Sequence, residues 1–191
     1  MGGKSVAMKT LGLNVMLAMC GWPVFAREAE LPFVSEISYV GTEISDEAEG
    51  YSLFGKEMYE LIQITKNIKE NSLVLIDEPA KGTNPEEGTA IVKGFSAFFA
   101  SQRGFFVIAT HYDGVAPLAN RHYRTYGFHD IEKLEKEIES MSEYTPDIFQ
   151  HYMKYGIYLS QDEKIPREAV RVCQLLGLAP EIVSLIKSYL K

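Results

Sequence analysis

The sequence predicts an α/β fold, with a mostly parallel β-sheet flanked by helices and a helical hairpin at the C-terminus. Two apolar runs, at residues 73–76 and 105–109, are separated by a segment of helical character at 86–102. Strands that are apolar on both faces belong in a covered parallel sheet, and a strand, a helix and a strand in this order form a βαβ unit. At 191 residues, the chain can fill one core and carry a small appendage.

The N-terminal part adds a helix, a strand and a second helix to this unit. Apolar residues recur at helical spacing over residues 6–20, and a glycine and a proline follow, which is typical of a helix end. A short, partly alternating run at 33–40 predicts a strand, and the acidic stretch at 43–49 predicts a solvated loop. The segment 56–69 predicts the second helix.

The region after the βαβ unit leaves two structures open. Apolar residues lie about one turn apart in the charged segment 131–142, which predicts an exposed helix. A pair of edge strands over residues 123–141 is the alternative. The aromatic segment 144–155 predicts a loop or a strand that returns to the core.

Two amphipathic helices, at residues 166–176 and 180–190, form the predicted hairpin. Such a hairpin cannot bury its apolar face alone, so it must dock on the main body or on a partner. We therefore divide the chain into a main domain, residues 1–155, and a helical appendage, residues 156–191.

Composition and charge exclude several classes of protein. The formal net charge of −7 argues against a domain that grips nucleic acid over a broad surface, because such binding needs clustered Lys and Arg. Cys20 and Cys173 are too few and too far apart for a disulfide framework or a zinc site. Both lie among apolar residues and are predicted to be buried, reduced thiols of a cytoplasmic protein. Beyond the N-terminal stretch, no apolar run approaches the roughly 20 residues that span a bilayer.

The N-terminus also matches the outline of a secretory signal peptide. Lys4 and Lys9 precede an apolar stretch at 11–22, and the sequence VFA at 24–26 resembles a cleavage site. The same stretch fits a helix that follows a phosphate-binding loop. The motifs described next favour that second interpretation.

Gly3, Lys4 and Ser5 lead into the first predicted helix, as the last residues of a Walker A loop do. Free backbone N–H groups and the helix dipole attract phosphate at a helix start. In such a loop, Lys4 would reach the β- and γ-phosphates of ATP and the Ser5 hydroxyl would bind Mg²⁺. The full motif has another glycine five residues before Gly3, and only Met1 and Gly2 precede it here, so these residues are a weak signal alone.

Two carboxylates and a histidine follow the two apolar runs. Asp77 and Glu78 come at the C-terminal end of a central strand, where α/β sheets bind their ligands. Asp77 can hold Mg²⁺, and Glu78 can act as a general base on the attacking water. In the alternative interpretation, Asp77 and Glu78 are only two surface acids at the end of a strand. His111 ends the next strand, where it could sense the γ-phosphate or orient the water; a structural histidine is the alternative.

Five segments together resemble the ATPase domain of MutS proteins in order and spacing: MGGKS at 1–5, GYSLFGKEM at 50–58, LVLIDE at 73–78, KGTNPEEG at 81–88 and ATHY at 109–112. The resemblance implies a P-loop NTPase-type fold of the ABC class that binds ATP and Mg²⁺. It also implies a homodimer with composite ATP sites. The final helical hairpin resembles the C-terminal helix-turn-helix of the same family, and the resemblance favours edge strands over an exposed helix for residues 123–141.

The resemblance assigns further residues. Gly2 joins Gly3, Lys4 and Ser5 in binding the phosphates. By the same resemblance, Gly50 and Ser52 match the signature segment that reaches the γ-phosphate of the partner subunit, and residues 82–84 match the loop along the dimer seam.

Two departures from the family leave the function open. The phosphate loop lacks its first half, so we expect that some backbone N–H donors to the phosphates are lost. We expect either a start codon that was assigned too late or a fragment of a longer protein. Residues 79–81 read PAK where mismatch-repair members have a Leu-Gly-Arg type of sequence, as in a branch that reactivates B12-dependent lysine or ornithine aminomutases. The alternatives are therefore an ATPase that serves DNA mismatch repair through DNA-binding modules outside this chain, an ATPase with a protein client, and a catalytically silent dimerisation fragment. None of them places the chain in a membrane.

Overall fold

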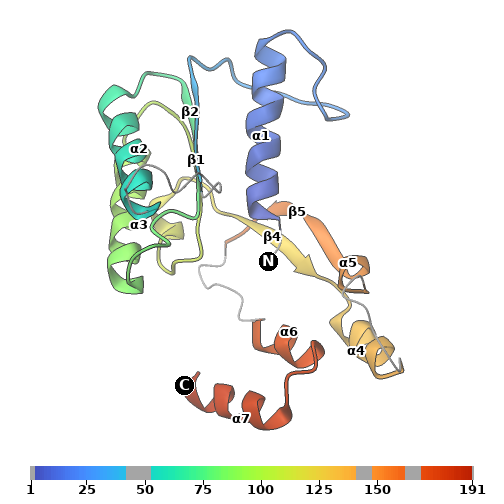
Figure 1. The fold of residues 1–191 in the computed structure, drawn as a ribbon. Helices are drawn as coiled ribbons and strands as arrows, with labels where there is room; N and C mark the ends of the chain where they lie inside the picture. Colours follow the sequence, from blue (N-terminus) through green and yellow to red (C-terminus); the bar gives the residue numbers. More distant parts are fainter. Residues whose placement is uncertain (1–2, 42–52, 141–147, 162–168, 191) are drawn as a thin grey trace. The chain divides into compact units, whose positions relative to one another are not determined.

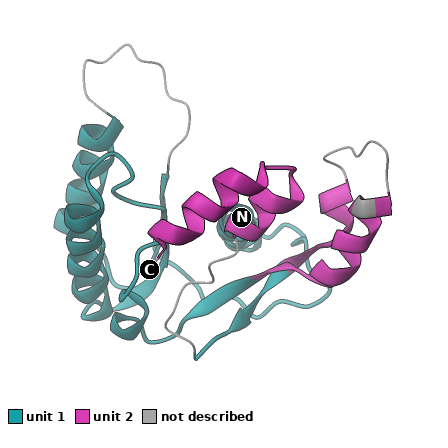
Figure 2. Ribbon diagram, turned by 90° about the horizontal axis from the view of Figure 1, so that it is seen from below, with its two compact units in different colours: residues 1, 3–125, 156–163 teal, residues 2, 126–155, 164–191 magenta. Residues whose placement is uncertain are grey.

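A computed structural model describes residues 3–41, 53–140, 148–161 and 169–190 of this chain. The chain divides into two compact units, which are coloured separately in Figure 2. The first consists mainly of residues 3–125 with 156–163, and the second of residues 126–155 with 164–191. Each unit is described by itself.

The first unit contains a parallel sheet of three strands, in the order β1 (Ile37–Gly41), β2 (Ser72–Asp77) and β3 (Gly104–Ala109). The register places Gly41, Asp77 and Ala109 side by side at the C-terminal edge. All six residues of the central strand β2 are buried, as expected of a strand covered on both faces. The predicted α/β fold with a parallel sheet is confirmed.

Three helices cover this sheet. Helix α1 (Lys4–Met19) lies on one face, and helices α2 (Leu53–Asn67) and α3 (Pro85–Ala100) lie on the other (Figure 1). Asn84 caps α3 by accepting a hydrogen bond from the Glu87 N–H at 2.9 Å, and the proline at the first helical position has the backbone angle that a helix start needs.

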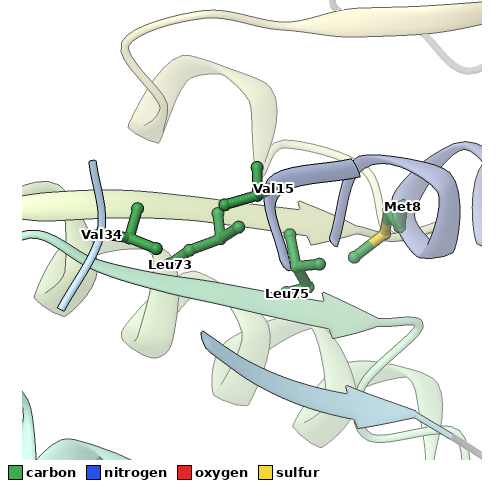
Figure 3. Close-up of a cluster of buried hydrophobic side chains, with 5 residues drawn as sticks. All are labelled: Met8, Val15, Val34, Leu73 and Leu75. Carbon is green, nitrogen blue, oxygen red and sulfur yellow. The ribbon is translucent and has the colours of Figure 1, made fainter. Parts of the chain in front are cut away.

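The alternation of side chains along β2 divides the core into two layers. Leu73 and Leu75 point toward α1, where they pack with Met8 and Val15 in the cluster shown in Figure 3. The intervening residues of β2 point the other way and pack against α2 and α3. The buried members of this second cluster are Val40, Leu61, Val74, Ile76 and Phe99. Side chains that alternate at period two thus fill both faces of one strand.

The segment that matched a signal peptide includes most of α1, whose inner face is part of this core. The chain then turns back, and the Asn14 side chain accepts a hydrogen bond from the Phe25 N–H at 2.6 Å. The prediction that Cys20 is buried is wrong, because Cys20 lies at the C-cap of α1, beyond the last residues that face the sheet. Cys173 is only partly buried. None of the described helices is long and apolar enough to cross a membrane.

In the first unit, a 3₁₀ turn (Ala116–Leu118) follows β3. The remaining elements are β4 (Tyr123–Phe128), α4 (Ile131–Ser140), α5 (Ile148–His151), β5 (Met153–Leu159), α6 (Ala169–Leu175) and α7 (Pro180–Tyr189). Strands β4 and β5 form a two-stranded sheet. In the second unit, a small core forms around Leu134, Ile148 and Tyr152, and Leu175 of α6 packs against it.

Of the two structures considered for residues 131–142, the helix is correct over α4, and the edge strands are limited to β4. Apolar residues at a spacing of three and four place Leu134 on one buried face of α4, a period that a strand cannot use. The returning strand predicted at 144–155 begins only at Met153, after the short helix α5.

Candidate active site

The C-terminal edge of the sheet brings together the residues that end β2 and β3 and the residue that begins α1. The Glu78 N–H donates a hydrogen bond to the Ala109 carbonyl at 2.8 Å, which continues the pairing of β2 and β3 by one residue. Lys4 reaches the same edge from the first position of α1. Parallel α/β sheets bind ligands at this edge.

Gly3 shapes the start of α1. Its φ of 77° lies in the left-handed region, which glycine adopts without steric cost. The first turn of α1 carries no acidic side chain, so the positive end of the helix dipole is not neutralised. Ser5 is exposed in this turn. A helix start of this kind favours an anionic ligand.

The Lys4 side chain contacts the ends of both neighbouring strands. Its Nζ lies 3.1 Å from Oε1 of Glu78 and 3.4 Å from the Thr110 carbonyl oxygen. The sequence placed Lys4 and Glu78 in one site although they are far apart in the chain, and the structure brings them into direct contact.

Asp77 is buried, with only 8% of its surface exposed. Its Oδ2 accepts a hydrogen bond from the Tyr39 hydroxyl at 3.3 Å, whereas its Oδ1 is buried and has no partner among the described residues. An unpartnered buried carboxylate oxygen is costly, and such an oxygen fits a hard cation such as Mg²⁺.

The described part of the chain contains no group of three or more His, Cys, Asp or Glu side chains that could hold a metal. Mg²⁺ in phosphate-binding sites generally has only one or two protein oxygens as ligands, so a single buried carboxylate such as that of Asp77 fits a site of this kind.

Two lysines hold the Glu78 carboxylate. Lys81 pairs with Oε2 while Lys4 pairs with Oε1. Burial raises the pKa of Glu78, but the hydrogen bonds from Lys81 and Lys4 oppose it, and the net pKa lies below the usual range. The hydrogen bond to Glu78 likewise raises the pKa of Lys81. Glu78 is thus held as a carboxylate, in a left-handed backbone conformation with φ of 51° that non-glycine residues rarely adopt.

The loop after Glu78 is fixed from two directions through the backbone of Ala80. The Ala80 N–H donates to Oε2 of Glu57 in α2 at 3.0 Å, and its carbonyl accepts from the Tyr112 hydroxyl at 2.9 Å. Burial raises the pKa of Glu57. Gly82 lies so close to Phe54 that an added Cβ would be 2.9 Å from the Phe54 Cβ. The segment that carries Glu78 and Lys81 is therefore bonded both to α2 and to the end of β3.

One sheet edge thus carries a lysine from a helix start, a buried aspartate and an ionised glutamate, in agreement with the motif order of the chain. A comparison with known protein families identifies the family. The family model described as MutS domain V matches residues 1–176. The chain belongs to this family. MutS domain V is an ATPase domain, so the predicted family and the P-loop type of α/β fold are both confirmed.

Several relatives of known identity are similar to this MutS domain V chain. It is 26% identical to the DNA mismatch repair protein MSH2 of Saccharomyces cerevisiae, over 91% of this chain and 19% of that protein. It is 29% identical to endonuclease MutS2 of Caldanaerobacter subterraneus, over 99% of this chain and 22% of the relative. The DNA mismatch repair protein MutS of Syntrophomonas wolfei is 37% identical over 63% of this chain and 14% of its own length. The chain thus spans about a fifth of the length of the first two relatives.

The remaining predicted residues of this MutS domain V chain fall into two groups. Gly2, Gly50 and Ser52 lie outside the described residues. His111 lies two residues after β3 and is exposed, and its ring centroid is 4.4 Å from that of Tyr112. Within the described part of the chain, no hydrogen bond or ion pair joins His111 to Lys4 or Glu78.

Four residues that contact the site were missed as site residues: Tyr39, Glu57, Lys81 and Tyr112. Lys81 and Tyr112 lie inside two of the matching motifs, and Glu57 lies in a third, so their position in those motifs was an available signal. No motif included Tyr39, because only the pairing of β1 with β2 brings it to Asp77.

Proposed function

We propose that this chain binds ATP with Mg²⁺ at the edge formed by Lys4, Asp77 and Glu78, and hydrolyses it. The observation that carries the proposal is the contact between Lys4, at the start of α1, and Glu78, at the end of β2. It supports a site in which a cation, a metal-ligating carboxylate and a general base surround one phosphate position.

In this proposal each residue has one role. The backbone of Gly2 and Gly3 and the Lys4 ammonium bind the phosphates, while Ser5 and Asp77 would hold Mg²⁺, which neutralises phosphate charge. Glu78 accepts a proton from water as the water oxygen bonds to the γ-phosphorus and the bond to the ADP oxygen breaks. His111 senses the γ-phosphate from the end of β3.

ATP binding requires an exchange of ion pairs. Lys4 is paired with Glu78 in this structure, and a triphosphate at the start of α1 offers it a stronger anionic partner. Lys81 also pairs with Glu78, so the carboxylate keeps a cationic partner after Lys4 has turned to the phosphates.

We further propose that the active form is a homodimer in which Gly50 and Ser52 of one copy complete the ATP site of the other. Dimer closure would then drive a DNA-handling assembly of the mismatch-repair kind, in the cytoplasm. The names of two of the relatives support the link to mismatch repair. The net charge of −7 agrees with DNA contacts made by segments other than this one.

The mass of the chain in solution tests the dimer, measured by light scattering with and without ATPγS and Mg²⁺. We expect a shift from monomer to dimer when both are present, and a weaker shift for Ser52→Ala. Ser101→Ala, at the far end of α3, is the matched control and should dimerise like the unaltered chain. A chain that stays monomeric at every nucleotide and protein concentration would refute the composite site.

A further inference from the structure

Tyr39 and Gly41 lie at the end of β1, next to the buried carboxylate of Asp77. In the parallel register, Gly41 is opposite Asp77 and Tyr39 is opposite Leu75. The Tyr39 hydroxyl nevertheless reaches Oδ2 of Asp77, at 3.3 Å. The phenol must therefore lean along its own strand, toward the C-terminal edge of the sheet.

Gly41 leaves the space that this orientation needs. Residues two apart in a strand share a face, so a side chain at position 41 would meet the Tyr39 ring. A Cβ added at Gly41 would lie 2.7 Å from the hydroxyl oxygen of Tyr39 and 2.8 and 2.9 Å from its Cε1 and Cζ. These distances are shorter than van der Waals contact, so any other residue at 41 would displace the phenol.

The hydrogen bond from Tyr39 makes the two carboxylate oxygens of Asp77 different from each other. Oδ2 is engaged, and Oδ1 is buried without a partner among the described residues. Lys9 of α1 approaches the Tyr39 ring, with its Nζ 5.6 Å from the ring centroid, so the ring has a neighbour on its face as well as at its hydroxyl. Metal-ligating carboxylates are commonly oriented by a hydrogen bond of this kind.

We propose that Tyr39 is a positioning residue that fixes the Asp77 carboxylate with Oδ1 toward a divalent cation, and that Gly41 makes room for it. This rests on the proposed function, in which Asp77 is a Mg²⁺ ligand. Tyr39 itself contacts neither the cation nor the nucleotide.

The test compares the affinity for a fluorescent ATPγS analogue in EDTA with that in Mg²⁺, because the ratio of the two dissociation constants measures the contribution of the metal. Loss of a hydrogen-bonding partner of a metal ligand typically weakens metal binding by about 10–100-fold. We expect Tyr39→Phe to reduce the Mg²⁺-dependent gain by about tenfold, with the affinity in EDTA unchanged. Gly41→Ala should have the same effect. Tyr59→Phe, an exposed tyrosine of α2, is the matched control and should retain the full gain.

Asp77→Asn separates this inference from the proposed function. If Asp77→Asn loses the Mg²⁺-dependent gain while Tyr39→Phe keeps it, the positioning role is wrong and the metal site stands. If neither variant changes the gain, or if the unaltered chain shows none, the metal site at Asp77 is wrong and the inference falls with it. Because Tyr39→Phe removes one hydroxyl only, thermal unfolding should show a folded chain.

Discussion

Gly88 lies in the first turns of α3, against the ring of Tyr112. A Cβ added by Gly88→Ala would overlap the Tyr112 hydroxyl oxygen and would lie 2.7 Å from the Tyr112 Cζ. The ring cannot move away freely, because its hydroxyl donates to the Ala80 carbonyl in the loop after Glu78. The substitution must therefore strain α3 and break the hydrogen bond that connects Tyr112, after β3, to this loop.

The expected change in the free energy of unfolding follows from three contributions. Overpacking in a filled site costs about 1–3 kcal/mol, and a lost hydrogen bond costs about 1 kcal/mol. An alanine in a helix interior gains about 1 kcal/mol over glycine. Gly88→Ala should thus destabilise the unaltered chain by about 1–3 kcal/mol. In a Tyr112→Ala background the clash is absent, and the same substitution should stabilise by about 0.5–1 kcal/mol.

Urea unfolding followed by circular dichroism on the four chains of this cycle would measure both values. Gly94→Ala is the matched control on the same helix, since a Cβ there meets nothing within 4 Å. It should stabilise the chain in both backgrounds. If Gly88→Ala stabilises the unaltered chain as Gly94→Ala does, the Tyr112 ring is not held against α3 by its hydrogen bond to Ala80.

Three further predictions concern Lys81, Leu75 and Glu78. Lys81→Met should lower the kcat for ATP about tenfold with little change in KM, because a charge-assisted hydrogen bond to the general base is lost. Lys81→Arg should restore the kcat. An unchanged kcat in Lys81→Met would exclude a role of Lys81 in holding Glu78. Leu75→Ala should lower the free energy of unfolding in urea by about 2–5 kcal/mol, since Leu75 is fully buried under α1. Leu13→Ala should lower it less, because Leu13 is more exposed. Equal losses of stability in the two variants would contradict the layered core. The lowered pKa of Glu78 means that its ion pairs stabilise the fold above its ordinary pKa of 4.5, and that this contribution is lost as the pH falls through the lowered value. The difference in stability between the unaltered chain and Glu78→Gln should therefore shrink in acid, and a difference independent of pH would show that the pairs do not stabilise the fold.

Much of the fold could be predicted from the sequence, because the central strand is apolar on both faces. The run at 73–76 predicts burial without knowledge of its neighbours, and Asp77 and Glu78 follow as the residues at its end. The helix spacing in α4 was also visible, but the resemblance to the family favoured strands there, and the local period determined the structure.

The contacts around the site depend on pairings that local sequence does not encode. Tyr39 reaches Asp77 only because β1 pairs with β2 in one register, and a shift by one residue would turn its side chain to the other face. Glu57 and Tyr112 meet at Ala80 from two separate elements. Cys20 illustrates the opposite error, since an apolar neighbourhood in the sequence did not place it on the inner face of α1.

The central claim is that Glu78, at the sheet edge beside Lys4, is the general base of an ATPase. Phosphate release from ATP and Mg²⁺ by the unaltered chain, Glu78→Gln and the control Glu70→Gln tests it most directly, because Glu70 is an exposed carboxylate paired with Arg103 away from the site. Glu78→Gln should lower kcat by about 10²–10⁴-fold, whereas Glu70→Gln should leave kcat unchanged. Equal turnover by the unaltered chain and Glu78→Gln would show that Glu78 is not the general base.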